Sequence, residues 1–206
     1  MSASIEVFGF PSVTPAQAPG LLVELEHALR DINLVTGEDC PDATYGRANR
    51  TLRPGPAALA FAGWGPREDG AVTGVSFHGP GYGNFLGMNM SDLTCGACGA
   101  HWGPDAPGYG DLFNTLGEST VPFTGGGPLV DVPCPGCGQG QDINAWFGQL
   151  ILAHAAVEVW NWSSLNPTAP RPDGPSTHWP HAATLVRDTM AKTCPQHALQ
   201  DGWGRL

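Results

Sequence analysis

The chain has 206 residues, a hydrophobic fraction of 41% and a formal net charge of −10. This length is sufficient to bury a core, which excludes a mini-domain that depends wholly on metal or disulfides. No run reaches the roughly 20 apolar residues of a membrane helix, and the N-terminus lacks the pattern of a secretory signal peptide. We therefore expect a cytoplasmic protein without a membrane span, folded as one domain over residues 1–206.

The first part of the chain predicts a strand followed by a helix. Residues 5–10 are mostly apolar and favour β structure. Thr14 and Pro15 supply an N-cap and a proline suited to the first helical turn. Apolar residues then recur at helical spacing, namely Leu22, Leu25, Leu29 and Ile32. We expect the firm helix to begin near Leu21 and to end at Gly37.

The connector that follows, residues 38–56, carries the basic cluster of the chain. Arg47, Arg50 and Arg53 recur at a spacing of three, which predicts one face of a helical turn. Two interpretations are open. The arginines either balance nearby acidic residues on a solvated face, or they contact an anion or a partner.

Short strands are expected next. Residues 57–64 and 71–77 are apolar segments separated by a turn-rich linker, which predicts a hairpin. Residues 84–90 form a further expected strand.

Two CxxC pairs are the most informative motif. Cys95 and Cys98 form the first pair, Cys134 and Cys137 the second, and 35 residues lie between them. Four thiolates in two such turns are the donor set of a tetrahedral zinc site. We interpret residues 91–140 as a zinc-knuckle insertion within the domain. The 35-residue interval holds eight glycines and five prolines, so only short strands are expected there, at residues 119–123 and 128–132.

The sequences CGACG and CPGCG at these pairs resemble those of zinc-ribbon proteins. The resemblance implies a structural Zn²⁺ held by Cys95, Cys98, Cys134 and Cys137. Four protein ligands leave no open position for water or substrate, so the resemblance does not imply Lewis-acid catalysis. The second motif is also similar to that of rubredoxin, which makes iron the alternative cofactor and an electron carrier an alternative function.

Two other uses of paired cysteines fit less well. In a thioredoxin-like site the cysteine pair opens a helix, whereas residues 138–141 separate Cys137 from the expected helix here. Nucleobase deaminases share the P-C-x-x-C fragment, but they also need an H-x-E motif, and none occurs in this sequence.

The last part of the chain predicts two helices and a linker. Apolar residues at helical spacing predict the strongest helix over residues 142–160, namely Ile143, Trp146, Phe147, Leu150, Ile151, His154 and Val157. Residues 163–180 are proline-rich and predict a linker or surface wrap. A final helix is expected over residues 181–193, and no element is expected in the tail around Trp203. The fold class is therefore α+β, with a mostly antiparallel sheet, two main helices on one face and an embedded Cys₄ zinc-ribbon-like module. Half of a ferredoxin-like arrangement is one topology that fits this order of elements.

The charge distribution bears on partners. No Lys or Arg occurs between Arg67 and Arg171, whereas nine acidic residues do. Nucleic-acid affinity depends on cations that neutralise phosphates, so we expect no nucleic acid at the zinc region. The same field favours a basic protein partner, and the loop tryptophans Trp102, Trp179 and Trp203 are candidate interface anchors.

These observations predict a non-catalytic, acidic protein that binds another protein or enters an assembly and is stabilised by structural zinc. An immunity or antitoxin-type inhibitor fits this description, as does a subunit of a larger assembly such as a virion. The alternative is an enzyme with a pocket around His78, His154 and Glu158, in which zinc is only structural. Whether Cys40, Cys194 and His197 form a second metal site stays open.

Overall fold

A computed structural model describes residues 4–40, 50–58, 74–83, 92–146, 151–160 and 181–205. The expected strand 84–90, the proline-rich segment 163–180, and the residues Arg47 and Trp179 lie outside these ranges. The main sheet has six strands in the order β12-β1-β11-β4-β3-β2, and every pairing is antiparallel. Its strands are β1 (Ser4–Gly9), β2 (Val35–Asp39), β3 (Arg50–Pro54), β4 (Gly74–His78), β11 (Ala156–Trp160) and β12 (Gln200–Arg205).

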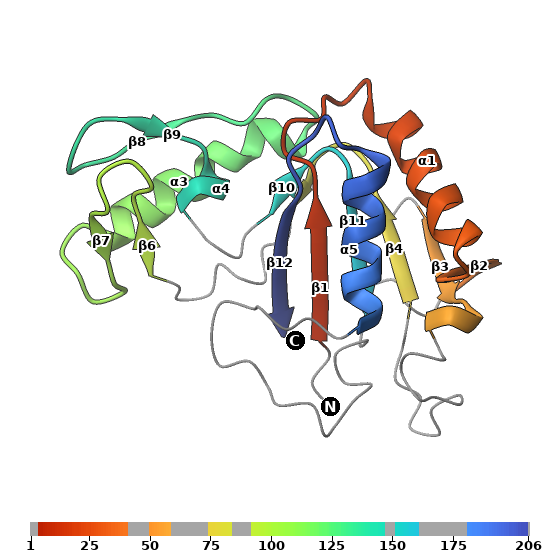
Figure 1. The fold of residues 1–206 in the computed structure, drawn as a ribbon. Coiled ribbons are helices and arrows are strands. Elements are labelled where there is room, and N and C mark those ends of the chain that lie inside the picture. The colour runs from red at the N-terminus through yellow and green to blue at the C-terminus, as the bar shows by residue number, and fades with distance from the viewer. Residues whose placement is uncertain are drawn as a thin grey trace.

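Helices α1 (Ala18–Asp31) and α5 (His181–Thr193) pack together on one face of this sheet, as Figure 1 shows. Alternation along each strand sends side chains to opposite faces. Phe8, Val157 and Val75 point toward the helices and join their main core, whereas Ile5, Ala156 and Trp160 belong to a smaller cluster on the other face. The α+β class, the antiparallel sheet and the two helices on one face are thus confirmed.

The connectivity explains the strand order. The chain runs from β1 through α1 to the far strand β2, returns through β3, β4 and β11 to the side of β1, and then crosses through α5 to β12. These are two split β-α-β units that share a sheet, with a four-strand return in place of the hairpin of the simplest ferredoxin-like pattern.

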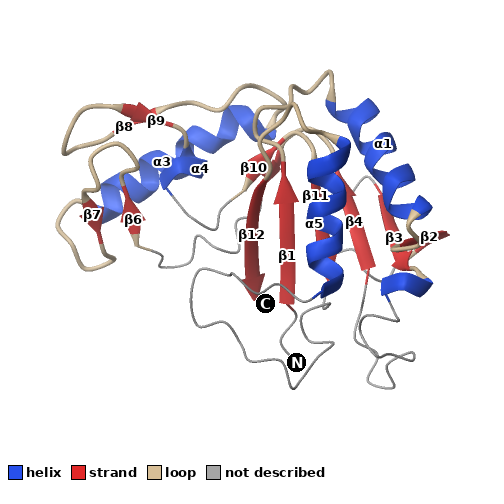
Figure 2. Ribbon diagram, viewed as in Figure 1, coloured by secondary structure: helices blue, strands red, loops and turns tan. Residues whose placement is uncertain are grey.

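A smaller unit, here called the Cys module (residues 92–146), lies beside the sheet and is inserted between β4 and β11 (Figure 2). It contains two short hairpins, β6 (Leu93–Thr94) with β7 (His101–Trp102) and β8 (Val132–Pro133) with β9 (Gly140–Gln141). Helix α3 (Tyr109–Thr124) connects them, and the short helix α4 (Ile143–Trp146) follows. A third pair, β5 (Tyr82–Gly83) with β10 (Leu152–Ala153), flanks the insertion.

Several expectations at the N-terminal half are corrected. Helix α1 begins at Ala18 after a turn over residues 14–17, with Gln17 rather than Thr14 at its N-cap. It ends at Asp31 because Asn33 takes a left-handed conformation (φ 58°) and the N–H of Leu34 closes back on the carbonyl of Leu29. Gly37, the expected end, lies in strand β2. Residues 50–54 form a strand instead of a helical turn, and residues 56–58 are helical instead of extended.

The largest corrections concern the centre and the C-terminus. The helix expected over residues 142–160 is confined, in the described residues, to α4, and its second half forms β10 and the central strand β11. The strand expected at 119–123 lies inside helix α3, and that expected at 128–132 contributes only Val132 to β8. The tail forms edge strand β12. By contrast, β1 and α5 lie where the sequence predicts them.

Candidate metal centre

Each cysteine pair forms the same tight hairpin turn. In the first, the N–H of Cys95 donates to Ala100 O (2.8 Å) and the N–H of Gly99 donates to Cys95 O (2.8 Å). In the second, the N–H of Cys134 donates to Gln139 O (2.9 Å) and the N–H of Gly138 to Cys134 O (2.7 Å). Both closing glycines have positive φ, 72° and 74°, which explains why glycine follows each CxxC. We call these turns the two knuckles.

The knuckles face each other and bring the four sulfur atoms together. All four Sγ atoms lie within 4.8 Å of one another, and the distances from Cys95 to Cys137 and from Cys98 to Cys134 are both 3.9 Å. A tetrahedral ion with bonds of about 2.3 Å to sulfur places its ligands about 3.8 Å apart. The four cysteines predicted from the sequence therefore form a group that could bind a metal such as zinc.

Hydrogen bonds and burial shift the pKa values of the two thiols in the first knuckle in opposite directions. Burial opposes the charged form of Cys95, but the backbone N–H groups of Cys98 and Ala97 favour it and lower its pKa to about 7. At Cys98 the backbone of Ala100 favours the thiolate, yet the neighbouring thiols, led by Cys95, and burial outweigh it and raise the pKa to about 12. The neighbouring thiols and burial thus oppose ionisation of Cys98, and a bound dication would favour the thiolate form of its ligands.

The module has a core of its own that holds the knuckles in place. Leu93, Leu116, Phe123 and Trp146 are among its fully buried side chains. Trp102 is half-buried and its ring lies tilted against Trp146 at 5.8 Å, so it packs partly within the module. The N–H of Gly96 in the first knuckle donates to the side chain of Gln141 beside the second (3.1 Å).

His154 joins the module to the sheet. Its ring stacks on Phe123 of α3 at 4.4 Å, and its Nδ1 accepts the N–H of Gly81 (3.1 Å). Burial lowers the pKa of His154, against the opposing effect of a hydrogen bond with the Gly127 backbone. Gly81 has φ +83°, and a Cβ there would lie 2.7 Å from the carbonyl of Thr124 at the end of α3. The joint therefore requires glycine and a neutral imidazole.

The alternative site residues are only partly brought together. His78 Nε2 lies 2.8 Å from Glu158 Oε2, and the hydroxyl of Tyr82 and the indole N–H of Trp160 also donate to the Glu158 carboxylate. The expected helix over residues 142–160 would have placed His154 and Glu158 one turn apart, but His154 lies between β10 and β11 and makes the joint described above. Sequence reasoning missed Tyr82, which lies four residues after His78 and has its pKa raised by burial and by Glu158.

A second buried carboxyl, Glu6, was also missed. Glu6 shares the face of β1 that bears Phe8, so it points toward the helices. It is only 4% exposed, and its Oε2 has no hydrogen-bond partner among the described residues. Burial raises the pKa of Glu6 to about 8, which keeps this group protonated at neutral pH.

The other titratable candidates do not form a second centre in the described residues. The Cys module holds the sole metal-ligand group found there. His197 contacts Ser12 through Nδ1 (3.1 Å), while Cys194 is buried in the main core. His101, in strand β7 of the Cys module, contacts Thr94 through Nδ1 and lies 3.7 Å from Asp92.

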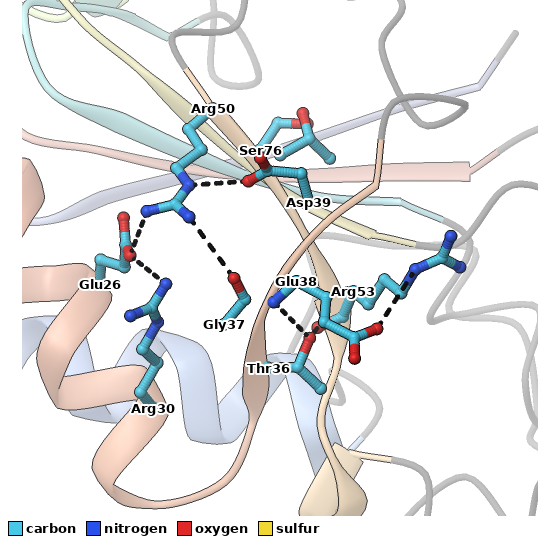
Figure 3. Close-up of polar contacts among 10 residues, drawn as sticks. Glu26, Arg30, Thr36, Gly37, Glu38, Asp39, Arg50, Arg53 and Ser76 are labelled. Atoms are coloured by element: carbon cyan, nitrogen blue, oxygen red, sulfur yellow. Dashed lines mark hydrogen bonds and ion pairs between the residues drawn. The ribbon is translucent and has the colours of Figure 1, made fainter.

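The basic cluster is neutralised by carboxylates where the structure describes it. Arg50 Nη1 lies 2.7 Å from Glu26 of α1 and its Nε lies 2.9 Å from Asp39 of β2 (Figure 3). Arg30 Nη2 lies 2.6 Å from the same Glu26 oxygen, Oε1, and Arg53 Nε lies 3.8 Å from Glu38 Oε2. These contacts support the balanced-face interpretation and tie α1 to the edge of the sheet.

The surface of the Cys module is acidic. It contains six acidic residues and no Lys or Arg, and five of the six are exposed: Asp92, Asp105, Asp111, Glu118 and Asp131. The sixth, Asp142, is half-buried and accepts the N–H of Ala145. Among the described residues no helix is both long and apolar enough to cross a membrane. Comparisons of the chain with protein-family models, curated proteins and solved structures found no match.

Proposed function

We propose that this protein is a non-catalytic binding protein whose Cys module, held together by structural zinc, docks a basic protein partner. The observation that carries the proposal is the exposed acidic surface of the module, which lacks any Lys or Arg. A Zn(Cys)₄ centre adds a formal charge of about −2 to the −6 of the carboxylates. Such a field attracts a basic surface and speeds association with it.

We prefer zinc to iron because the role that the fold suggests for the metal is to hold segments of the chain together. The ligands close an interval of 35 residues whose one long element is α3, and loop closure by four bonds holds the small core of the module together. Metal analysis and an absorbance spectrum of protein purified without a metal-affinity tag test this choice. One zinc per chain without a visible band is expected, whereas iron with charge-transfer bands would support the electron carrier.

The partner is tested with matched charge variants of the full chain. In the module variant Asp105→Asn, Asp111→Asn and Glu118→Gln remove three exposed charges, and in the control Glu24→Gln, Asp31→Asn and Asp188→Asn remove three from the helices α1 and α5. The tagged proteins are cross-linked in the native host and recovered. A basic protein that is retained by wild type and control, and is lost from the module variant and in high salt, is the expected result. Equal retention by both variants, or no partner at all, would count against the proposal.

An inhibitor and an assembly subunit make different predictions for the recovered partner. An immunity or antitoxin-type inhibitor should return a basic enzyme whose activity falls when one equivalent of this protein is added. A subunit of a larger assembly, such as a virion, should return several copies of a particle component and no enzyme.

The second candidate is an enzyme that uses His78 and Glu158, and the 2.8 Å contact between them is the observation in its favour. In this version His78 is the general base, and the Glu158 carboxylate holds its imidazole ring in the required orientation. A turnover found by substrate screening should then be lost in His78→Asn and Tyr82→Phe and kept in His27→Asn, a control on the exposed side of α1. Unchanged turnover in His78→Asn would exclude this candidate.

A further inference from the structure

We propose that the four-cysteine centre is an oxidation site, at which a peroxide converts the thiolates into two disulfides that each join one knuckle to the other and release the metal. The proposal rests on the zinc occupancy suggested above. It assigns to the centre a chemical modification in addition to its structural role.

Accessibility is distributed unevenly over the four ligands. Cys98 and Cys137 are exposed, whereas Cys95 and Cys134 are buried, so each knuckle offers one sulfur to a small oxidant in water. The two sulfur contacts of 3.9 Å connect Cys98 with Cys134 and Cys137 with Cys95. Each close pair therefore combines an exposed sulfur, which an oxidant reaches, with a buried sulfur of the opposite knuckle, which lies ready to resolve the product.

The chemistry balances with a peroxide as the oxidant. The exposed thiolate attacks hydrogen peroxide, a sulfur–oxygen bond forms as the oxygen–oxygen bond breaks, and hydroxide leaves. The buried thiolate then attacks that sulfur, a disulfide forms, and the sulfur–oxygen bond breaks with loss of a second hydroxide. Each disulfide takes two electrons from two thiolates and consumes one peroxide. Two peroxides thus consume all four thiolates and free one Zn²⁺.

The consequence differs from simple loss of the metal. Disulfides between knuckles keep the interval from Cys98 to Cys134 closed, so the module retains its topology. The formal charge of about −2 at the metal centre disappears, which weakens the attraction for a basic partner. Disulfides within each knuckle would instead leave the two hairpins unconnected.

The test is oxidation of the zinc-loaded full chain with hydrogen peroxide. Zinc release is followed with a chromogenic chelator, and disulfides are mapped by mass spectrometry. Trypsin is unsuitable, because no Lys or Arg lies between Arg67 and Arg171. A protease that cleaves at acidic residues separates the knuckles at four positions, namely Asp105, Asp111, Glu118 and Asp131. We expect one zinc released per two peroxides and a cross-linked pair of knuckle peptides, reversed by a thiol reductant and Zn²⁺.

The variant Cys98→Ser resolves the pairing, since it should retain the Cys95–Cys137 link and leave Cys134 free for alkylation. Cys40 and Cys194, which are buried outside the module, should remain alkylatable after denaturation and serve as the internal control. Disulfides confined to single knuckles, irreversible oxidation of Cys98 and Cys137, or zinc retained under peroxide would each overturn the proposal. Protein that lacks zinc as purified would overturn the zinc assignment instead, and the disulfide map alone would then decide the oxidation proposal.

Discussion

Replacing Glu6 by glutamine should remove a loss of stability that wild type suffers as the pH rises from about 4.5 to 8. The unfolded carboxyl ionises near its ordinary pKa of 4.5, whereas the folded one keeps its proton until about pH 8. Between these values unfolding releases a proton, so the free energy of unfolding falls by about 1.4 kcal/mol per pH unit. Over the whole interval the loss is about 5 kcal/mol, a large share of the stability of a domain. The stability contributed by protonated Glu6 is therefore complete below pH 4.5 and is lost as the pH rises toward 8.

Urea denaturation of wild type, Glu6→Gln and the control Glu24→Gln, repeated from pH 5 to pH 8.5, measures this effect. Glu24 is exposed on α1, so its variant should follow the wild-type pH profile. The neutral amide in Glu6→Gln removes the titration, and the difference from wild type should grow with pH. Parallel profiles of wild type and Glu6→Gln would show that the Glu6 carboxyl is paired or hydrated in the folded protein.

Four further predictions concern the Cys module, the joint, helix α3 and the charge network. Chelation of the metal should raise amide hydrogen exchange throughout the Cys module while the sheet strands stay protected; uniform exchange of both would refute a separate module core. Gly81→Ala should destabilise the protein by about 1–3 kcal/mol, because φ is +83° and the new methyl meets the Thr124 carbonyl. A methyl group at Gly117 of α3 would meet no other atom, so Gly117→Ala should stabilise the protein by about 0.5–1 kcal/mol. Thermal unfolding of wild type and both glycine variants measures these two effects. Arg50→Ala, which breaks two close ion pairs, should cost up to about 1 kcal/mol, and Arg53→Ala should have no measurable effect.

The parts of the fold that were predicted correctly have residue patterns within their own segments that indicate the structure. Strand β1 is a short apolar run that buries both of its faces, with Phe8 against the helices and Ile5 and Val7 on the other side. Helix α5 buries one set of side chains, Ala183, Val186 and Met190, whose helical spacing is visible in the sequence. The knuckles were predictable for a different reason: four cysteines and two closing glycines define the turn and the donor set with little help from the rest of the chain.

The central strand β11 could not be recognised by the same means. All five of its residues are buried, because helices cover one face of the sheet and the cluster around Ile151 covers the other. A continuous apolar run has no period of two, and the residues before it happen to repeat at helical spacing. Glu158 would ordinarily argue against a buried strand, and it is tolerated because three side chains donate to it.

Helix α3 was missed because glycine and proline were counted without regard to position. Its buried residues Leu112, Leu116, Thr120 and Phe123 follow a helical spacing that was available in the sequence. Pro122 lies in the last turn, where it removes one hydrogen bond of the helix, and the helix ends two residues later at Thr124. Asp111 favours the first turn. Edge strand β12 had no such signal, since its sequence QDGWGR gains its conformation from pairing with β1.

The surroundings of Glu158 also bear on the choice between binding and catalysis. An ionised carboxylate has about four acceptor positions, and Tyr82, His78 and Trp160 occupy three of them. His78 is 4% exposed and Glu158 6%, so a substrate would have to displace protein contacts before reaching either group. A buried network with most of its acceptor positions filled fixes the arrangement of strands, here β4, β5 and β11. The exposed carboxylates of the Cys module have the opposite character, because they lie at the surface of a module that contains no Lys or Arg. On this physical contrast, binding at the module is favoured over chemistry at Glu158.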